Sequence, residues 1–516
     1  PKLWWPKGYG APHLYDVEFC FETDGKVTDK TSFKSGVRQM TYSEETYKPS
    51  GGMSVGSFGQ SEPQRLSLFI NGRRFIGFGG NWGFGESNLN YREREYDIAV
   101  AYHADMNFTM IRNWVGQIGD KEFYEACDRH GIMVWQDFWL ANPVDGPNPY
   151  YTEMFNANAC DYLKRIRNHP SIGIYVGRNE GNPPAGIDDY LRGLVFREHP
   201  GLYYISNSAM GVVSGGGPYR ALSPKSYFQS YGHDKFHSER GMPNVMNYES
   251  MLLTFGTDKI EPVNTSETPN PVYGLHDYTL GGGKGSSAQA ASSFNDMIEK
   301  AFGRPRDAKQ FAEWAQWINY DGYRAIFEGR SEHRRGMLLW MSHSAWPSMV
   351  WQTYDYYFDP NAAYFGCKKA SEPLHIQWNP LRDDIEVVNY HAFDRTGLTA
   401  TASLFNQDGT LQWTRETKLD IKEDQTVACF PLEQPETLSD TYFIKLSLTD
   451  SDGKQLSDNF YWRGKEDGNY KSLLQLPKVS VCKNVTVKKT GKEWLIRAVL
   501  KNEARTPALM LRLKVA

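Results

Sequence analysis

The sequence lacks the features that mark metal, redox and membrane proteins. Its six cysteines are scattered from Cys20 to Cys482, and no two of them have the CxxC spacing of a zinc or thiol–disulfide site. No apolar run approaches the roughly 20 residues that a transmembrane helix needs. We therefore expect buried free thiols, no metal, no cofactor and no membrane span.

The chain also has little net charge. The formal net charge is −4 over 516 residues, which leaves no polybasic stripe to neutralise a phosphate backbone, so nucleic acid is not an expected partner. Hydrophobic residues make up 40% and charged residues 23%, which is the balance of a globular protein. A typical domain has roughly 100 to 200 residues, so we expect several cores.

Aromatic residues are abundant, at 14% of the chain with 15 tryptophans and 31 tyrosines. Flat rings can pack against the C–H faces of sugars, which makes this excess a hint of carbohydrate binding. Large β-rich proteins also bury many aromatic side chains in their cores. Composition alone favours burial over sugar binding, so the hint needs support from motifs.

Residues 67–371 alternate short apolar segments with helical patterns, which is typical of parallel βα units. One such helix is predicted between Asp120, a candidate N-cap, and Gly131, a candidate C-terminal stop. The span is close to the roughly 250 residues of a (β/α)8 TIM barrel. A doubly wound open sheet is the alternative, but the glycines at 77–80 do not form the GxGxxG pattern that its first turn would carry.

The segments on both sides of the predicted barrel alternate apolar and polar residues, as antiparallel strands do. Residues 1–66 predict part of a β-sandwich, ending in a linker rich in Gly, Ser and Pro at 49–63. Residues 372–465 predict a complete sandwich, and residues 466–516 a partial one. Asp-Gly pairs predict tight turns at Asp24-Gly25, Asp408-Gly409 and Asp452-Gly453. The chain is thus predicted to be multidomain, with all-β units around an α/β barrel.

Two glutamates stand directly after predicted strands. Glu180 follows the apolar segment 172–176, and Glu239 lies near the end of the segment 235–241. In a (β/α)8 barrel the active site lies at the carboxyl ends of the strands. Retaining glycoside hydrolysis needs two carboxyl groups roughly 5 to 5.5 Å apart, one protonated and one ionised. Arg112, at the end of another strand, is placed to keep one of them ionised.

Two alternatives apply to these glutamates. A strand-end glutamate can also cap a helix or form a surface ion pair, and sequence spacing does not separate these roles from catalysis. Glu249, ten residues beyond Glu239, is a rival nucleophile, because the segment Asn247-Tyr248-Glu249-Ser250 is also centred on a glutamate. Helical propensity after Met246 places Glu249 on the following helix, so Glu239 is preferred.

Motifs over nearly the whole chain resemble those of glycoside hydrolase family 2. They are Gly79-Gly80-Asn81-Trp82, Met110-Ile111-Arg112-Asn113-Trp114, the segment 131–138, Arg167-Asn168-His169-Pro170-Ser171, Asn179-Glu180 and the segment 236–241. The segments 339–346 and 364–375 resemble the branch that holds plant endo-β-mannosidase and bacterial exo-β-D-glucosaminidase. The resemblance implies a TIM barrel flanked by immunoglobulin-like β-sandwich domains.

The resemblance also implies residue roles where positions match. Glu180 resembles the general acid/base, Glu239 the nucleophile and Arg112 the arginine beside the nucleophile. Asn179 resembles the partner of the sugar 2-hydroxyl, and Trp340 resembles the aromatic platform under the sugar. The remaining residues that we expect to bind substrate are Trp82, Trp114, Trp135 and Trp346.

The function that the resemblance implies is double-displacement hydrolysis of a β-glycoside, with a β-linked oligosaccharide or glycan as the bound partner. Exo-glucosaminidases tend to carry Ser-Asp where this chain has Asn179-Glu180, whereas the segment 176–184 resembles endo-β-mannosidases, so β-mannosides are the preferred substrates. Exo-β-D-glucosaminidase, β-galactosidase and β-glucuronidase activities are alternatives within the family. A non-catalytic carbohydrate-binding protein is the alternative outside it.

The sequence assigns neither an oligomeric state nor a choice between exo and endo action. No signal peptide is recognisable before the first strand-like residues. A periplasmic or secreted location is expected if a leader precedes Pro1.

Overall fold

An eight-stranded parallel sheet forms the centre of the computed structural model, which describes residues 1–46, 64–230, 235–280, 286–491 and 493–515. The linker predicted at 49–63 lies outside the described residues. The sheet confirms the predicted parallel βα arrangement. Its strands are β6 (Gly77–Trp82), β7 (Met110–Asn113), β8 (Met133–Asp137), β9 (Ile172–Arg178), β10 (Tyr204–Asn207), β11 (Val213–Ser214), β12 (Phe236–Arg240) and β13 (Gly336–Leu339).

The order of the strands in space is β10-β9-β8-β7-β6-β13-β12-β11. Strands that follow one another in sequence are therefore neighbours, except for β10 and β11, and the last strand, β13, pairs in parallel with the first, β6. This order curls the sheet around its own axis and leaves β10 and β11 as its two edges. All of its residues but one are buried, because the sheet is covered on both faces.

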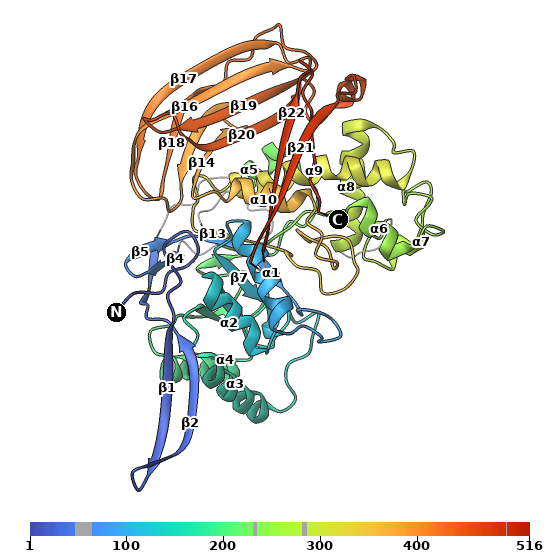
Figure 1. Cartoon of the computed structure of the whole chain (residues 1–516). Coiled ribbons are helices and arrows are strands. Elements are labelled where there is room, and N and C mark those ends of the chain that lie inside the picture. Colours follow the sequence, from blue (N-terminus) through green and yellow to red (C-terminus); the bar gives the residue numbers. More distant parts are fainter. Residues whose placement is uncertain (47–63, 231–234, 281–285, 492, 516) are drawn as a thin grey trace.

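Helices pack around the curled sheet, as Figure 1 shows. The predicted helix runs over α2 (Lys121–His130), with Asp120 at its N-cap and Gly131 in the left-handed conformation at its end (φ 72°). The Asp120 carboxylate does not cap the helix, however, and instead accepts a hydrogen bond from the Tyr96 hydroxyl at 2.6 Å. The other helices are α1 (Glu93–Asp105), η1 (Trp114–Gly116), α3 (Thr152–Ile166), α4 (Ala185–Glu198), α5 (Pro224–Gln229), α6 (Tyr248–Phe255), α7 (Pro271–Gly274), α8 (Ser286–Phe302), α9 (Ala308–Glu328), α10 (Ala362–Ala370) and η2 (Lys471–Gln475).

A small antiparallel sheet covers the amino ends of the parallel strands. It consists of β3 (Met40–Thr46), β4 (Gln64–Ile70) and β5 (Arg73–Phe75). The Tyr42 hydroxyl donates to the carbonyl of Gly173 at the start of β9, and the Leu66 amide donates to Val212, just before β11. In the described part of the chain, the small sheet thus covers this end of the curled sheet, and the candidate residues lie at the opposite end, where the strands finish.

Two antiparallel sheets follow the parallel sheet and enclose a separate apolar core. This core is made by alternate residues along the strands, which face inward. Gly409 and Gly453 adopt positive φ at the predicted Asp-Gly turns. The sheets consist of β14 (Leu374–Asn379), β15 (Asp384–Asn389) and β18 (Gln425–Pro431), and of β16 (Arg395–Asn406), β17 (Leu411–Ile421), β19 (Thr441–Thr449) and β20 (Gln455–Gly464).

A buried polar cluster joins these sheets to α9. His375 on β14 contacts Glu328 of α9 at 3.0 Å and Glu372 at 3.1 Å. The same Glu328 carboxylate accepts hydrogen bonds from Asn459 and Tyr461 on β20. Burial lowers the pKa of His375, but the contacts with the two carboxylates outweigh it and leave the pKa above its usual value. The motif segment 364–375 therefore ends at an interface between α9 and the antiparallel sheets.

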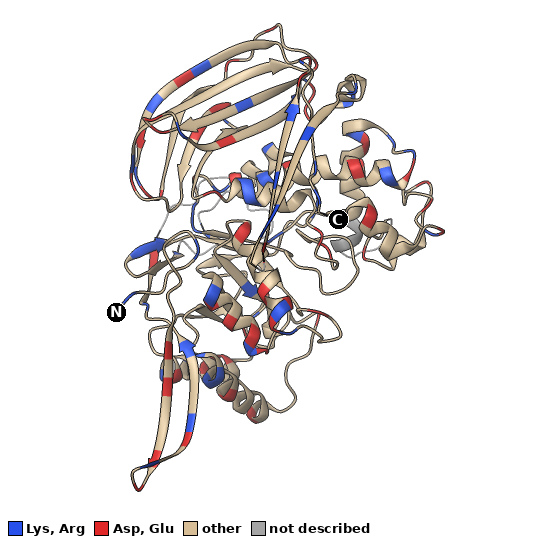
Figure 2. Cartoon of the chain, in the orientation of Figure 1, with Lys and Arg blue, Asp and Glu red and all other residues tan. Residues whose placement is uncertain are grey.

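Two hairpins extend from the rest of the chain: β1 (Tyr15–Thr23) with β2 (Lys26–Ser35), and β21 (Val481–Thr490) with β22 (Glu493–Asn502). Figure 2 shows acidic and basic residues interspersed along β1 and β2, where Lys34 pairs with Asp16. The expectation that the free thiols are buried is wrong for Cys20 and Cys482, because each lies exposed on one of these hairpins. Among the described residues, no helix combines the length and the apolar composition needed to cross a bilayer.

Candidate active site

Four of the parallel strands bring ionisable or amide side chains together at their carboxyl ends. Arg112 lies on β7, Asp137 ends β8, Asn179 directly follows β9, and Glu239 lies on β12. All four are buried, and Glu239 is only 2% exposed. Parallel strands end at one edge of a sheet, which is why residues so far apart in sequence meet here.

Arg112 is the centre of this group. Its Nη1 donates to Oε1 of Glu239 at 2.7 Å, and its Nη2 donates to Oδ2 of Asp137 at 2.6 Å. Nη2 also donates to Oδ1 of Asn179 at 2.9 Å. The planar guanidinium thus holds two carboxylates and one amide in fixed positions, which a flexible lysine ammonium would not do.

Tyr219 connects the two predicted catalytic glutamates. Its hydroxyl lies 2.6 Å from Oε2 of Glu239 and 3.3 Å from Oε1 of Glu180. Because one oxygen is within hydrogen-bonding reach of both, these two carboxylate oxygens can be no more than about 6 Å apart. That limit is close to the roughly 5 to 5.5 Å separation typical of retaining glycosidases and below the roughly 6.5 to 9.5 Å of inverting ones.

Sequence analysis did not identify Tyr219. It lies beyond β11, in a loop whose Gly215-Gly216-Gly217-Pro218 run indicates only a turn. The loop is fastened to β12, because the Gly217 amide donates to the carbonyl of Glu239 at 3.1 Å and the Gly241 amide donates to that of Pro218. Burial raises the pKa of Tyr219 well above its usual value, so its hydroxyl stays protonated and can donate to the carboxylates.

The two glutamates differ in their electrostatic surroundings. Burial raises the pKa of Glu239 and that of Glu180. Arg112 acts in the opposite sense on both, but it contacts Glu239 directly, and the Tyr219 hydroxyl is also closer to Glu239. These contacts stabilise the ionised form of Glu239 more than that of Glu180, and they act against the burial that raises the pKa of Glu239 to about 7.

Aromatic rings lie beside the ring of Tyr219. The Trp340 ring lies 4.9 Å from that of Trp114 and 6.4 Å from that of Tyr219. The Trp351 ring, which sequence analysis did not single out, lies 5.8 Å from Tyr219. Trp114, Trp340 and Trp351 are all partly exposed, so they can offer ring area to a ligand.

The other predicted tryptophans are not part of this cluster of rings. Trp82 is fully buried and stacks on His343 at 4.4 Å. Trp135 is fully buried against Phe236, and its Nε1 donates to Oδ1 of Asp137 at 2.9 Å, so it supports a carboxylate that Arg112 holds. Neither ring has an exposed face in this structure. Trp346 is 36% exposed and stacks on His276 at 6.0 Å.

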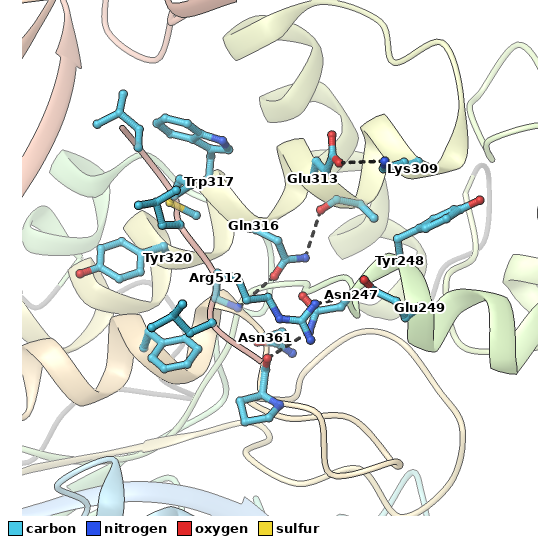
Figure 3. Close-up of a pocket in the computed structure, with 18 residues that line it drawn as sticks. Asn247, Tyr248, Glu249, Lys309, Glu313, Gln316, Trp317, Tyr320, Asn361 and Arg512 are labelled. Carbon is cyan, nitrogen blue, oxygen red and sulfur yellow. Dashed lines mark hydrogen bonds and ion pairs between the residues drawn. The ribbon is translucent and has the colours of Figure 1, made fainter. Parts of the chain in front are cut away.

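The rival carboxylate, Glu249, lies elsewhere. It is in the first turn of α6 and forms an ion pair with Arg512 at 3.1 Å. Both line a cavity of about 820 Å³ between α6, α9, α10 and residues 509–513, shown in Figure 3. Arg112, Glu180 and Glu239 do not line this cavity, so Glu249 is not part of the carboxylate group around Tyr219.

Comparison with known proteins identifies relatives of the chain. The family model of glycosyl hydrolases family 2 matches residues 1–38. A mannosylglycoprotein endo-beta-mannosidase of Lilium longiflorum is 29% identical, covering 92% of this chain and 53% of the relative. An exo-beta-D-glucosaminidase of Streptomyces avermitilis is 27% identical, covering 90% of this chain and 52% of the relative. The chain therefore spans about half the length of the curated relatives it matches.

Two solved structures share the fold. The exo-chitosanase of Amycolatopsis orientalis superposes with a TM-score of 0.82 at 23% identity, covering 98% of this chain and 62% of that one. A beta-D-mannosidase from Dictyoglomus thermophilum superposes with a TM-score of 0.77 at 21% identity, covering 97% of this chain and 62% of that one. Together with the sequence matches, they confirm the resemblance that the motifs indicate.

Proposed function

We propose that this chain, which resembles the glycosyl hydrolases of family 2 along most of its length, carries the catalytic part of a retaining β-glycoside hydrolase. The single observation that supports this most is the Tyr219 hydroxyl within hydrogen-bonding distance of both Glu180 and Glu239. It limits the distance between Oε1 of Glu180 and Oε2 of Glu239 to about 6 Å, which is compatible with the roughly 5 to 5.5 Å carboxyl separation of double displacement.

In the proposed mechanism, Glu239 is the nucleophile. Its carboxylate, kept ionised by Arg112, attacks the anomeric carbon and forms a glycosyl ester. The bond to the leaving oxygen breaks at the same time, and Glu180 gives that oxygen its proton. In the second step water gives a proton to Glu180 and attacks the same carbon, which releases Glu239 and a sugar of retained configuration.

The proposed substrate is a β-mannoside within a glycan. The Lilium longiflorum relative supports this choice, and the Streptomyces avermitilis relative supports exo-β-D-glucosaminidase activity as the second candidate. β-Galactosides and β-glucuronides are alternative substrates, because the same two carboxylates could hydrolyse them. A binding protein without catalysis is the alternative of another class, and the paired carboxylates weigh against it.

We further infer which residues contact the sugar. Asn179, Arg112, Trp114 and Trp340 lie within or beside the carboxylate group, and Trp340 is the proposed platform. Trp346 is kept as a more distant candidate. Trp82 and Trp135 are not included, because a ring without exposed area has no face to offer.

The proposed domain organisation follows the predicted boundaries. Residues 67–371 would form a (β/α)8 barrel, to which the order of the eight strands is suited. Residues 372–465 would form an immunoglobulin-like sandwich. Residues 1–66 and 466–516 would be parts of further sandwiches.

The proposal is tested with nitrophenyl β-glycosides of mannose, glucosamine, galactose and glucuronic acid. Glu239→Ala should abolish turnover, and added azide or formate should restore part of it with a changed product configuration, because the small anion attacks in place of the missing carboxylate. Glu180→Ala should lose less activity on a dinitrophenyl glycoside, whose leaving group needs little protonation. Glu249→Ala is the control and should keep wild-type rates. Wild-type rates in both catalytic variants would refute the assignment.

A further inference from the structure

Ser208 is a fully buried serine that directly follows β10 and lies beside the end of β9. Its hydroxyl accepts a hydrogen bond from the Glu180 amide at 3.0 Å and donates one to Oδ1 of Asn179 at 3.3 Å. Its own amide donates to the carbonyl of Arg178 at 3.1 Å. One side chain thus contacts both members of the Asn179-Glu180 pair.

The direction of each of these hydrogen bonds follows from which of its two atoms carries a hydrogen. A guanidinium can only donate, so the Asn179 side-chain atom 2.9 Å from Nη2 of Arg112 must be the oxygen. Ser208 lies next to that same oxygen and must therefore give it the hydroxyl proton. The lone pairs of the hydroxyl then remain for the Glu180 amide, which is the contact observed.

The Asn179-Glu180 turn needs such support. Glu180 has a φ of 46°, in the left-handed region that non-glycine residues adopt only at an energetic cost. The Glu180 amide is held by Ser208, and the preceding Asn179 amide donates to the carbonyl of Leu140 at 2.9 Å. These two bonds hold the turn that directs the Glu180 carboxyl towards Tyr219 and Glu239.

We propose that Ser208 is a positioning residue that sets two groups of the site at once: the carboxyl of Glu180 and the NH2 of Asn179. This inference rests on the proposed glycosidase function and adds to it a basis for substrate choice. Because Arg112 and Ser208 both donate to Oδ1, the NH2 is the half of the amide left for a ligand. It donates to none of the residues that the structure describes.

The consequence is a preference at one position of the sugar. An NH2 group needs an acceptor lone pair, which the oxygen of the sugar 2-hydroxyl, next to the anomeric carbon, supplies. A protonated 2-amino group has no lone pair and would place two donors face to face. The site should therefore favour a neutral 2-hydroxyl sugar over a cationic 2-amino sugar, and this discrimination should weaken as rising pH deprotonates the amine.

The test compares Ser208→Ala with Ser208→Thr, which keeps a hydroxyl, and with Ser171→Ala. Ser171 is a matched control, because it is fully buried at the start of β9 and its hydroxyl has no partner among the described residues. Thermal unfolding confirms that each variant is folded. The main readout is the ratio of kcat/KM for a nitrophenyl β-mannoside to that for its 2-deoxy analogue.

Ser208→Ala should lower this ratio by about tenfold, the effect of one misplaced hydrogen bond. It should also slow a substrate with a poor leaving group more than a dinitrophenyl glycoside, because Glu180 loses its position. Ser171→Ala should change neither, and Ser208→Thr, if folded, should restore part of both. A ratio within twofold of wild type in folded Ser208→Ala would overturn the inference while leaving the proposed function intact.

If the wild type hydrolyses no glycoside, the proposed function fails, and Ser208 is still tested by binding. Calorimetry would then compare the affinities of the mannoside and its 2-deoxy analogue for the wild type and Ser208→Ala. A preference for the 2-hydroxyl sugar that disappears in Ser208→Ala supports the positioning role. Equal loss of affinity for both sugars, or no loss, contradicts it.

Discussion

Arg112 donates from Nη1 to Oε1 of Glu239 across 2.7 Å, and both side chains are almost completely buried. A charge in such a place is stable only when it is paired, because burial removes the water that would otherwise solvate it. The ion pair therefore favours the ionised form of Glu239 against the effect of burial, and it also fixes the position of the carboxylate.

Arg112→Lys should lower kcat/KM on the order of 100-fold, because lysine keeps the charge but cannot hold Glu239, Asp137 and Asn179 together. Arg112 lowers the pKa of Glu239, so a weaker contact should raise that pKa and move the acid limb of the kcat/KM profile to higher pH. Arg415→Lys, at an exposed pair with Glu433, is the control. An acid limb at the wild-type position would show that Arg112 does not control the ionisation of Glu239.

Tyr219→Phe should shift the acid limb of the pH profile upward. The hydroxyl has a single proton, which it donates across the shorter contact to the ionised Glu239, so it lowers the pKa of Glu239 and its removal takes away this effect. The rate at the optimum should fall on the order of 100-fold, comparable to the loss of an oxyanion donor. Full profiles of Tyr219→Phe and of the exposed control Tyr150→Phe would be compared. If the rate fell but the acid limb of the pH profile stayed at its wild-type position, Tyr219 would have only a packing role.

Trp340→Ala should reduce kcat/KM for a nitrophenyl mannoside by about 100-fold, equivalent to about 2.7 kcal/mol. Trp340→Phe should recover part of the loss, because a smaller ring still covers one face of the sugar. Trp494→Ala, on the exposed hairpin β21–β22, is the control for loss of a tryptophan. Equal rates in Trp340→Ala and wild type would exclude Trp340 as the platform.

His375→Gln should lower the free energy of unfolding by about 3 kcal/mol near pH 6, because Glu328 and Glu372 lose the buried cation that they share, although Arg324 and Lys369 remain beside them. The pKa of His375 is raised in the folded state, so its contribution is complete below the unfolded pKa and is lost as pH rises through the folded pKa. Chemical denaturation from pH 6 to 9 should show the difference from wild type shrinking. A difference that stays constant with pH would mean that His375 is neutral in the folded protein.

The predictable parts of the fold are those with a local cause. The ends of α2 follow from Asp120 and Gly131, and the strand that precedes Glu180 follows from its apolar run. The exposure of Cys20 was not predictable, because a thiol says nothing about which face of a hairpin is covered.

The site was predictable in part, for a related reason. Glu180, Glu239 and Arg112 stand at strand ends, where the topology of parallel strands brings residues together. Tyr219 and Ser208 lie in loops without periodicity, so only the folded chain reveals that they meet the carboxylates. Motif matching could not separate Trp340 from Trp82 either, because a tryptophan beside a strand looks the same whether its ring faces a cavity or the core.

The ends of β7, β8, β9 and β12 are tied by one guanidinium, whereas Trp340 and Trp351 come from the connection beyond β13. The proposed catalytic carboxylates and the aromatic surface proposed to bind the sugar are thus built from separate parts of the chain. Connections can diverge over evolution, or be exchanged by grafting, without retuning the central ion pair. Proteins that share this frame are therefore expected to differ more in the sugar they accept than in how they break its bond.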